Sequence, residues 1–568
     1  MPEPSDYRLD DSRRLTGGNL YWDRPSAIID VSIEGDPAPI VAAWETAVAD
    51  WLACVGYGDE KTTFRLFDGG ASLLISAPID VLYSMCELNE LAWATALAAV
   101  CGDEAPDPEE ECPRLNRLFD EERNPKLLAL QKESRRRGVP FLWDDDEVSV
   151  GYGAGTTVWA PDALPSVDNV DWQSAGSVPV AMVTGTNGKS TTVRMTAAIF
   201  AAAGLNAGLT STDFIRVGGR TIDTGDYSGT GGARMLMRQP DLDAAVLEVA
   251  RGGLLRRGLG LERADVAVVT NVAADHLGDY GIYTVEELIP AKFIVRRALH
   301  GGAPLVLNAD DKGIVAHAAT LAERIHWFSL KNDNAVVGQS LAAGGSACFL
   351  RDGWLVYANG GGQRDIAHVR DIPSTFDGAA RYNVANALAA ISIACILGIP
   401  DAAIRRGLKA FRGDESDNPG RGNWFEHRDV RILVDFAHNE HGMLALADMV
   451  RRVPSKRITL LMGQAGDRPD KDIADLVRAA CSITPDTLLI TALPGYERGR
   501  ELMDVPHLIR DEALNHGLGK DQIEILGSPE EAVQQALRQA RAGDLLVLLV
   551  LTRRQQALDL IHHYIGNN

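Results

Sequence analysis

The sequence predicts an α/β protein of three domains, and three observations support this fold class. Short apolar runs alternate with longer helical patterns from residue 178 onward, which is typical of a parallel sheet wrapped by helices. A glycine-rich turn joins the first of these runs to a helix. A second alternating series begins after residue 422 and indicates a further doubly wound unit.

Length and composition agree with this reading. The 568 residues are 46% hydrophobic and 24% charged, as in an ordinary globular chain of roughly three to four domains. With 56 basic and 78 acidic residues the formal charge is −22, which argues against nucleic acid or an anionic membrane as a partner. The polar N-terminus and the lack of about 18 consecutive apolar residues predict neither a signal peptide nor a membrane span.

The seven cysteines are scattered and include no CxxC pair. This spacing predicts neither a zinc knuckle nor a disulfide framework. It suits a protein of the reducing cytoplasm.

The N-terminal domain is expected to be α+β and to span residues 1–155. It combines a strand at 26–33 with helices at 41–55 and 88–100, followed by an acidic, proline-bearing stretch at 102–113. From residue 152 the chain becomes rich in Gly, Pro, Ser and Asp, and residues 156–177 are predicted to be a linker.

The central domain is expected over 178–412 and the C-terminal domain, a Rossmann-like unit, over 413–568. Strands of the central domain are predicted at 178–183, 244–249, 266–270 and 305–307, and its helices at 191–203, 285–299, 383–397 and 402–411. After a hinge at 413–422, strands are predicted at 432–436, 458–462, 487–491 and 545–551, and helices at 441–450, 473–480 and 529–541.

The strongest motif is a phosphate-binding loop, TGTNGKSTT, at residues 184–192. A buried strand that turns through glycines into a helix presents backbone N–H groups to a phosphate. Lys189 would reach the β- and γ-phosphates, and Ser190 or Thr191 would bind magnesium. A glycine turn with a chance lysine is the alternative, which the flanking strand and helix disfavour. The predicted nucleotide-binding residues of the loop are Gly185, Thr186, Asn187, Gly188, Lys189, Ser190 and Thr191.

Two neighbouring strands end in groups that suit a metal-bound nucleotide. Glu248 ends the strand at 244–249, where a carboxylate would lie beside the phosphate loop as a hard oxygen ligand. Asp275 and His276 follow the strand at 266–270. A lone histidine after a strand is more often structural. The case for His276 as a functional residue therefore depends on the phosphate loop and on the strand end that carries Glu248.

Further candidates each have an ordinary structural alternative. Lys292 could be a solvated helix lysine, and Asn308 and Asp310 could cap a turn instead of binding a nucleotide. Asn383 and Asn386 share a helix face, and capping explains Asn383 nearly as well.

In the C-terminal domain, polar groups follow two strand ends that would form a ligand crevice. Asp435, His438 and Asn439 follow the first, and Asp467 and Arg468 follow the second. Arg421, at the hinge, and Arg468 are cations suited to a nucleotide phosphate or a substrate carboxylate, although incidental surface arginines remain an alternative.

This order of motifs resembles the Mur ligase family. GTNGKST, the Glu248 strand end, TNVAADH, the helix lysine, VLNADD, RYNVANALAA, DFAHN and GQAGDR occur in the family's order. Within the family, the chain is most similar to the ligase module of cyanophycin synthetases, through residues 225–234, 244–258 and 419–421. Residues 13–21, Arg24 with Pro25, 137–140 and 150–153 resemble the N-terminal domain of those enzymes.

The resemblance implies an ATP-dependent carboxylate–amine ligase that works through an acyl phosphate and releases ADP and phosphate. It implies Lys189, Glu248, His276 and Lys292 as catalytic residues. It also implies up to two Mg²⁺ ions near Ser190, Glu248, His276 and Lys292, the lysine acting as its carbamate. It places Asn308, Asp310, Asn383, Asn386, Arg421 and Asp435 at the nucleotide, and His438, Asn439, Asp467 and Arg468 at the substrate.

Other features of the resemblance concern partners. The chain passes almost directly from the N-terminal domain to the phosphate loop, so the ATP-grasp module of cyanophycin synthetases is expected to be absent, and it could be a separately encoded partner. A small amino acid, arginine by analogy, and an acidic amino-acid or peptide acceptor are the expected substrates, and a homo-oligomer is expected. Phe436 and Glu440 depart from the family's usual tyrosine and proline, which puts the amine in doubt.

Three alternatives remain open. A degenerate ligase could serve as a nucleotide-binding scaffold, although the retained candidate residues speak against it. A simple P-loop ATPase or kinase would release ADP without an amine. A folate-type, glutamate-adding ligase is disfavoured by the N-terminal domain and the closer motif match.

Overall fold

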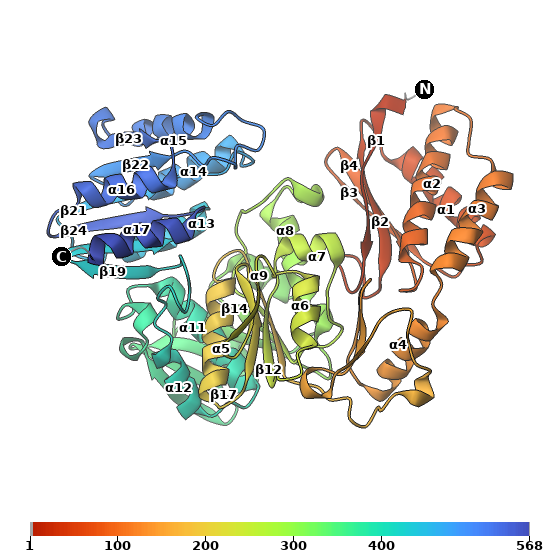
Figure 1. Cartoon of the computed structure of the whole chain (residues 1–568), viewed down its shortest axis with the longest axis horizontal. Helices are drawn as coiled ribbons and strands as arrows, with labels where there is room; N and C mark the ends of the chain where they lie inside the picture. The colour runs from red at the N-terminus through yellow and green to blue at the C-terminus, as the bar shows by residue number, and fades with distance from the viewer. Residues whose placement is uncertain (1–3, 567–568) are drawn as a thin grey trace.

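Three α/β parts follow one another along the chain in a computed structural model that describes residues 4–566, which confirms the predicted fold class. Figure 1 shows the N-terminal elements on one side of the central sheet and the C-terminal elements on the other. No helix within residues 4–566 combines the length and the apolar character that a bilayer crossing requires.

The N-terminal domain is an antiparallel sheet in the order β1-β2-β4-β3, covered by helices. Ile29 and Leu73 on one face of this sheet share a core with Trp44, and the indole N–H of Trp44 donates to Asn89 at 2.8 Å. The strands are β1 (Tyr7–Leu15), β2 (Ser26–Ile33), β3 (Thr62–Phe67) and β4 (Gly70–Ser76), and the helices are α1 (Ala38–Cys54), α2 (Leu82–Cys101), α3 (Pro108–Glu122) and α4 (Pro125–Arg137).

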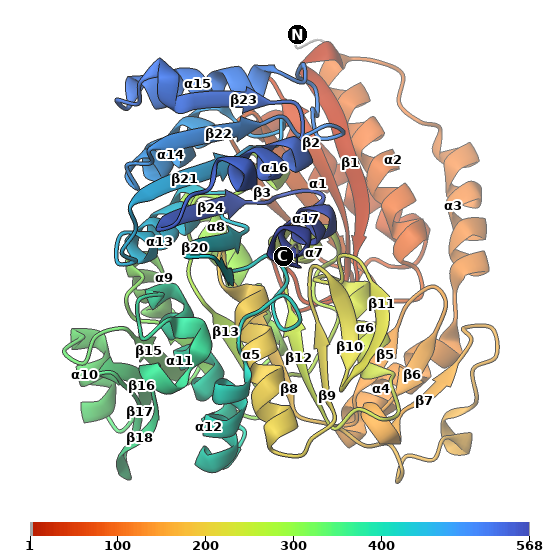
Figure 2. The same cartoon turned by 60° about the vertical axis from the view of Figure 1, so that its left-hand side comes forward.

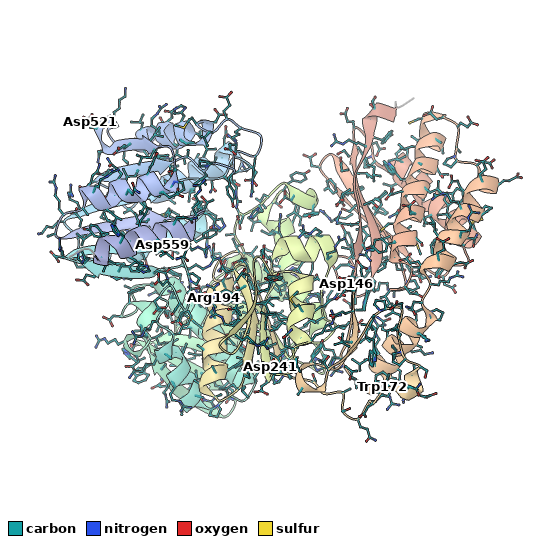
Figure 3. The ribbon with its side chains drawn as sticks, in the orientation of Figure 1. Asp146, Trp172, Arg194, Asp241, Asp521 and Asp559 are labelled. Atoms are coloured by element: carbon teal, nitrogen blue, oxygen red, sulfur yellow. A yellow bond between two sulfur atoms is a disulfide. The ribbon has the colours of Figure 1, made fainter. Side chains whose placement is uncertain are left out.

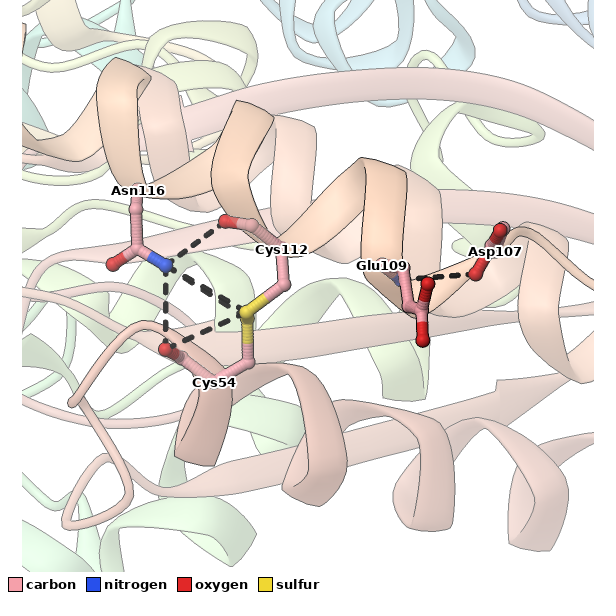
Figure 4. Close-up of a disulfide and its surroundings, with 5 residues drawn as sticks. All are labelled: Cys54, Asp107, Glu109, Cys112 and Asn116. Carbon is pink, nitrogen blue, oxygen red and sulfur yellow. Dashed lines mark hydrogen bonds between the residues drawn. A yellow bond between two sulfur atoms is a disulfide. The ribbon is translucent and has the colours of Figure 1, made fainter.

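Helix α3 begins inside the acidic stretch, where Asp107 accepts a hydrogen bond from the N–H of Glu109 at 2.9 Å. Cys112 of this helix forms a disulfide with Cys54 of α1 (Figure 4). The Asn116 amide donates to the Cys112 carbonyl at 2.9 Å beside it. The scattered cysteines predicted no disulfide framework, and this one bond was not foreseen, because helices that are distant in sequence bring the two thiols together.

A small three-stranded sheet follows, made of β5 (Phe141–Trp143), β6 (Val148–Val150) and β7 (Thr157–Trp159). β7 lies in the segment predicted to be a linker. Leu164 and Val170 of that segment are buried against the N-terminal core.

The central sheet has eleven strands in the order β11-β10-β9-β12-β8-β13-β14-β15-β16-β17-β18. It is parallel from β9 to β16, and antiparallel strands extend both edges. The strands are β8 (Val180–Thr184), β9 (Ala207–Thr210), β10 (Phe214–Val217), β11 (Arg220–Thr224), β12 (Ala244–Glu248), β13 (Val266–Val269), β14 (Leu305–Asn308), β15 (Ile325–Ser329), β16 (Ser346–Arg351), β17 (Trp354–Asn359) and β18 (Gly362–His368).

Helices cover both faces of this sheet, which is why its central strands are apolar throughout. Met182 packs with α6, α7 and α8 on one face, and Val183 packs with α5, α11 and α12 on the other. The helices are α5 (Lys189–Ala202), α6 (Thr230–Met237), α7 (Arg251–Arg257), α8 (Val285–Lys292), α9 (Lys312–Ala318), α10 (Ala335–Ala342), α11 (Arg381–Ile396) and α12 (Asp401–Ala410).

The C-terminal domain is a six-stranded sheet in the order β19-β20-β24-β21-β22-β23, parallel except for its β19 edge. Its strands are β19 (Asn423–His427), β20 (Val430–Asp435), β21 (Arg457–Met462), β22 (Thr487–Thr491), β23 (Ile523–Leu526) and β24 (Asp544–Leu549). Its helices are α13 (Glu440–Val450), α14 (Asp470–Cys481), α15 (Asp504–Asn515), α16 (Pro529–Gln539) and α17 (Arg554–Gly566).

Two motifs that lie far apart in sequence meet between the N-terminal and central domains. The N–H of Thr16 donates to the Arg257 carbonyl at 2.7 Å, and the N–H of Leu259 donates to the Gly18 carbonyl at 2.8 Å. A Cβ on Gly17 would lie 2.4 Å from the Leu259 carbonyl oxygen, so only glycine allows this approach. The segment 13–21 of the N-terminal domain therefore packs against the C-terminal end of α7 in the central domain.

Candidate active site

A cavity of about 1120 Å³ lies at the carboxyl ends of the central strands, between the central and C-terminal domains. Figure 2 shows the C-terminal domain above β8 and α5. The predicted residues that line the cavity are Thr186, Asn187, Gly188, Lys189, Ser190, Thr191, Glu248, His276, Lys292, Asn308, Asp310, Asn383, Asn386, Arg421, Asp435 and His438. Gly185, Asn439, Asp467 and Arg468 lie outside this lining.

The phosphate loop connects β8 to α5 and turns at Gly188, where φ is +84°. A Cβ on Gly188 would lie 2.2 Å from the Asn386 side-chain oxygen, so this asparagine supports the loop from α11. Lys189 folds back over the loop, and its Nζ donates to the carbonyls of Gly185 at 3.0 Å and Thr186 at 2.9 Å. The lysine is therefore held over the loop at the cavity wall.

Glu248 is the last residue of β12 and is only 2% exposed. Neither of its carboxylate oxygens has a hydrogen-bond partner among residues 4–566. A buried carboxylate without a partner is costly, and a hard cation would compensate it. The donor set, with the Ser190 hydroxyl on the same cavity wall, fits Mg²⁺.

The described chain contains no cluster of three or more His, Cys, Asp or Glu side chains arranged to hold a metal ion. A cation here would therefore complete its shell with a hydroxyl, water and phosphate oxygens, as Mg²⁺ does in nucleotide sites.

Lys292 is the last residue of α8, a helix that begins with a capping box between Thr284 and Glu287. Its side chain is buried, and Nζ donates to the Gly185 carbonyl at 3.0 Å. Burial, reinforced by the charge of Lys189, lowers the pKa of Lys292 well below its ordinary value. This lysine touches the phosphate loop and is not a solvated surface residue.

Asp275 and His276 contact the C-terminal domain through Arg468. The Arg468 guanidinium donates to Asp275 at 2.9 Å and to Nε2 of His276 at 3.1 Å. Partial loss of hydration and the nearby guanidinium charges of Arg468 and Arg251 lower the pKa of His276 to about 4, so the ring is neutral at pH 7. Since arginine only donates, Nε2 acts as the acceptor and Nδ1 carries the ring proton, so neither ring nitrogen is free for a cation while this contact is made.

The polar wall that follows β14 is held by protein groups. The Asn308 amide donates to the Thr270 carbonyl at 2.9 Å and its oxygen accepts from the N–H of Asp310. Asp310 accepts from the Ser329 hydroxyl at 2.8 Å and from two further donors. On α11, Asn383 donates to the Ser374 carbonyl at 2.8 Å. These three side chains shape the cavity wall.

The C-terminal domain closes on the phosphate loop through Asn439, whose oxygen accepts from the Asn187 amide at 3.1 Å. Asn439 also caps α13 by accepting from the N–H of Gly442. Nε2 of His438 lies 3.8 Å from an Asp275 oxygen.

Arg421 and Asp435 line the cavity, whereas Asp467 does not. The Arg421 guanidinium donates to the Thr212 hydroxyl at 3.0 Å. Burial raises the pKa of the Asp435 carboxyl. Asp467 pairs with Arg498, outside the cavity lining.

A buried ionic cluster between the domains had no sequence signal, because its members come from four separate segments. Arg194 of α5, labelled at the domain junction in Figure 3, is 3% exposed and donates to Asn418 at 2.7 Å. It also pairs with Asp213, which accepts from Arg554 of α17 at 2.8 Å. These contacts join the C-terminal domain to the central domain.

The N-terminal domain holds the loop that follows His276. Arg65 of β3 donates to the Tyr280 carbonyl at 2.6 Å and to the Gly281 carbonyl at 2.9 Å. Arg13 lies 4.9 Å from the centre of the Tyr280 ring. Arg65 donates to the same loop that carries the cavity residues Asp279 and Tyr280. We therefore interpret Arg65 as a positioning residue.

Arg65→Ala is expected to lower kcat about 10-fold and to raise the Mg²⁺ concentration for half-maximal activity, because two hydrogen bonds that orient the loop are lost. Arg8→Ala, on the exposed part of β1, is the matched control. The measurement is phosphate release across a magnesium titration. An unchanged magnesium requirement would show that the contact only joins the domains.

Comparison with known proteins adds two domain matches. Residues 183–394 match the Mur ligase middle domain, and residues 420–549 match the Mur ligase glutamate ligase domain. A cyanophycin synthetase of Crocosphaera subtropica is 35% identical over 376 residues, which cover 66% of this chain and 43% of that protein. The chain thus spans less than half the length of that relative.

More distant proteins match over a similar share of the chain. The UDP-N-acetylmuramoyl-L-alanyl-D-glutamate--2,6-diaminopimelate ligase of Bacillus velezensis is 26% identical over 378 residues, covering 64% of this chain and 71% of that one. Among solved structures, E. coli FolC in complex with DHPP and ADP superposes with a TM-score of 0.52 and 22% identity, over 68% of this chain and 89% of that chain. That likeness shows the fold.

Proposed function

The chain belongs to the Mur ligase family through its middle and C-terminal domains, and we propose that it is an ATP-dependent ligase that forms an amide bond between a carboxylate and an amine. One observation carries this proposal: Lys189, the unpaired Glu248 carboxylate and the buried Lys292 line a single cavity. The C-terminal domain closes that cavity through Asn439.

The proposed reaction proceeds in two steps. A carboxylate does not acylate an amine at neutral pH, so its oxygen first takes the γ-phosphoryl group of ATP to give an acyl phosphate and ADP. The amine then attacks the acyl carbon, and phosphate leaves. Lys189 would neutralise charge on the transferring phosphoryl group, and closure of the C-terminal domain would exclude water from the acyl phosphate.

Mg²⁺ would lower the charge repulsion around the phosphates when bound. Ser190 and Glu248 would hold it, and His276 would join them through Nε2 only once Arg468 releases that nitrogen. Lys292 as an ammonium cannot bind a cation. Its burial and lowered pKa favour the neutral amine, which can add to CO₂ with loss of a proton to give a carbamate, and the carbamate oxygens would then serve as ligands. Among related solved structures, one bifunctional folylpolyglutamate synthase/dihydrofolate synthase carries Mn and AMPPNP.

The substrates follow from the resemblance to cyanophycin synthetases. We propose an amino acid, arginine by analogy, as the amine and an acidic amino acid or peptide as the acceptor. His438, Asn439, Asp467 and Arg468 would contribute to the substrate side through domain closure, and Asp467 pairs with Arg498 in this structure. A homo-oligomer, a cytoplasmic location and a separately encoded ATP-grasp partner complete the proposal.

A phosphate-release screen of the twenty amino acids against small acidic acceptors tests this function. We expect release to require one amino acid and one acceptor together, and mass spectrometry to find a product with the mass of the two joined minus water. Release that is independent of any amine would instead favour a simple ATPase. Nucleotide binding without turnover would favour the scaffold alternative.

A further inference from the structure

Arg251 has a buried guanidinium that no part of the proposed mechanism uses. It is the first residue of α7, three residues after Glu248, and it lines the same cavity. The residue is 7% exposed. Its Nη2 donates to Asp279 at 2.7 Å, but its Nη1 has no hydrogen-bond partner within the described chain.

This arrangement is costly without a ligand. Burial lowers the pKa of Arg251, with only partial compensation from Asp279 and Asp275. The Asp279 side chain is 59% exposed, so solvent weakens its attraction for the guanidinium. A buried arginine with an unused donor is the kind of group that an anionic ligand would satisfy.

The charges around Arg251 are mixed. The cavity lining near it contains Lys189, Lys292 and Arg256 together with the carboxylates of Asp226, Glu248, Asp275 and Asp279. The case for an anion therefore rests on the unused Nη1 donor of Arg251 and not on a surplus of positive charge.

Arg251 lies apart from the parts of the cavity that suit ATP. The phosphate loop enters the cavity from β8 and α5, and a second wall from β15, α11 and α13 offers Phe328, Tyr382 and Leu446. Arg251 belongs to a third wall with Asp226, Ser228 and Tyr280, formed by loops on the α6–α8 side of the sheet. A second, acidic substrate would have to reach the γ-phosphate from the side of the cavity that the nucleotide does not occupy.

We propose that Arg251 binds a carboxylate of the acceptor, using Nη1 while Asp279 holds the other half of the guanidinium fork. The proposal rests on the proposed function, since it assigns the acceptor of that reaction to the class of acidic amino acids and peptides. Arg65 grips the carbonyl of Tyr280, the residue after Asp279, so the N-terminal domain supports this subsite.

The test measures binding of tri-aspartate to the enzyme loaded with Mg²⁺ and AMPPNP, by titration calorimetry, with tri-asparagine as the counterpart that lacks side-chain charges. We expect saturable binding of tri-aspartate to the wild type. Arg251→Gln should weaken it about 10- to 100-fold, because a charge-assisted hydrogen bond is lost, and Arg251→Lys should weaken it less. The Kd of AMPPNP should stay within about 2-fold of the wild-type value.

Arg257→Gln is the matched control, because Arg257 lies exposed on the same helix and outside the cavity lining. Thermal unfolding checks that Arg251→Gln is folded. The proposal is overturned if tri-aspartate fails to bind the wild type, if Arg251→Gln binds it as tightly, or if AMPPNP binding weakens equally. Failure of the ligase function is a separate result: amine-dependent phosphate release would be missing while the Arg251-dependent binding persists.

Discussion

Replacing Lys189 with alanine is expected to lower amine-dependent phosphate release at least about 1,000-fold, since preorganised charges at a transferring phosphoryl group supply effects of this size. The side chain is held over the phosphate loop by the carbonyls of Gly185 and Thr186. Alanine removes the charge and leaves the helical start of α5 intact, so the fold should persist.

Single-turnover phosphate release and circular dichroism measure the two parts of this prediction. Lys409→Ala, an exposed lysine of α12, is the control and should behave as the wild type. Retention of activity within about 10-fold in Lys189→Ala would falsify the assignment of this lysine to the γ-phosphate.

Replacing Glu248 with glutamine should change activity and stability in opposite directions. Without Mg²⁺, the variant should be more stable than the wild type by about 1–3 kcal/mol, because an unpaired buried charge is replaced by a neutral amide of the same shape. Phosphate release should fall about 100- to 1,000-fold, because the carboxylate proposed to hold the cation is lost.

Thermal unfolding with and without Mg²⁺ and AMPPNP separates these effects. The ligands should stabilise the wild type more than Glu248→Gln, since ligand binding to the native state adds to its stability. Glu286→Gln, an exposed residue at the start of α8, is the control. Equal stabilisation of the wild type and Glu248→Gln would remove Glu248 from the metal site.

Elements with a strong local pattern were predictable. The strands β8, β12 and β14 are short apolar runs, because both faces of a parallel sheet are covered by helices. Helix α3 was missed because its prolines and acidic residues resemble a loop. In the structure, Pro108 occupies the first turn, where no intrahelical N–H bond is needed, and Asp107 caps the helix.

The hairpin strands β10 and β11 were also missed. Their pairing is antiparallel and local, but β11 is largely exposed and polar, so it lacks the hydrophobic alternation that marks a strand. The disulfide between Cys54 and Cys112 was missed because its residues are 58 positions apart and come together only when α1 and α3 pack.

The sequence by itself determined the order of the domains, the phosphate loop with Lys189, and the strand end that carries Glu248, because each depends on a few neighbouring residues in one element. Only the tertiary structure decided which groups are left without partners and which distant segments meet. The unused donor of Arg251, the grip of Arg65 on the loop after His276, and the pairing of Arg194 with Asp213 are examples. Burial and hydrogen-bond satisfaction are properties of the packed chain, and a side chain's neighbours in space are not its neighbours in sequence.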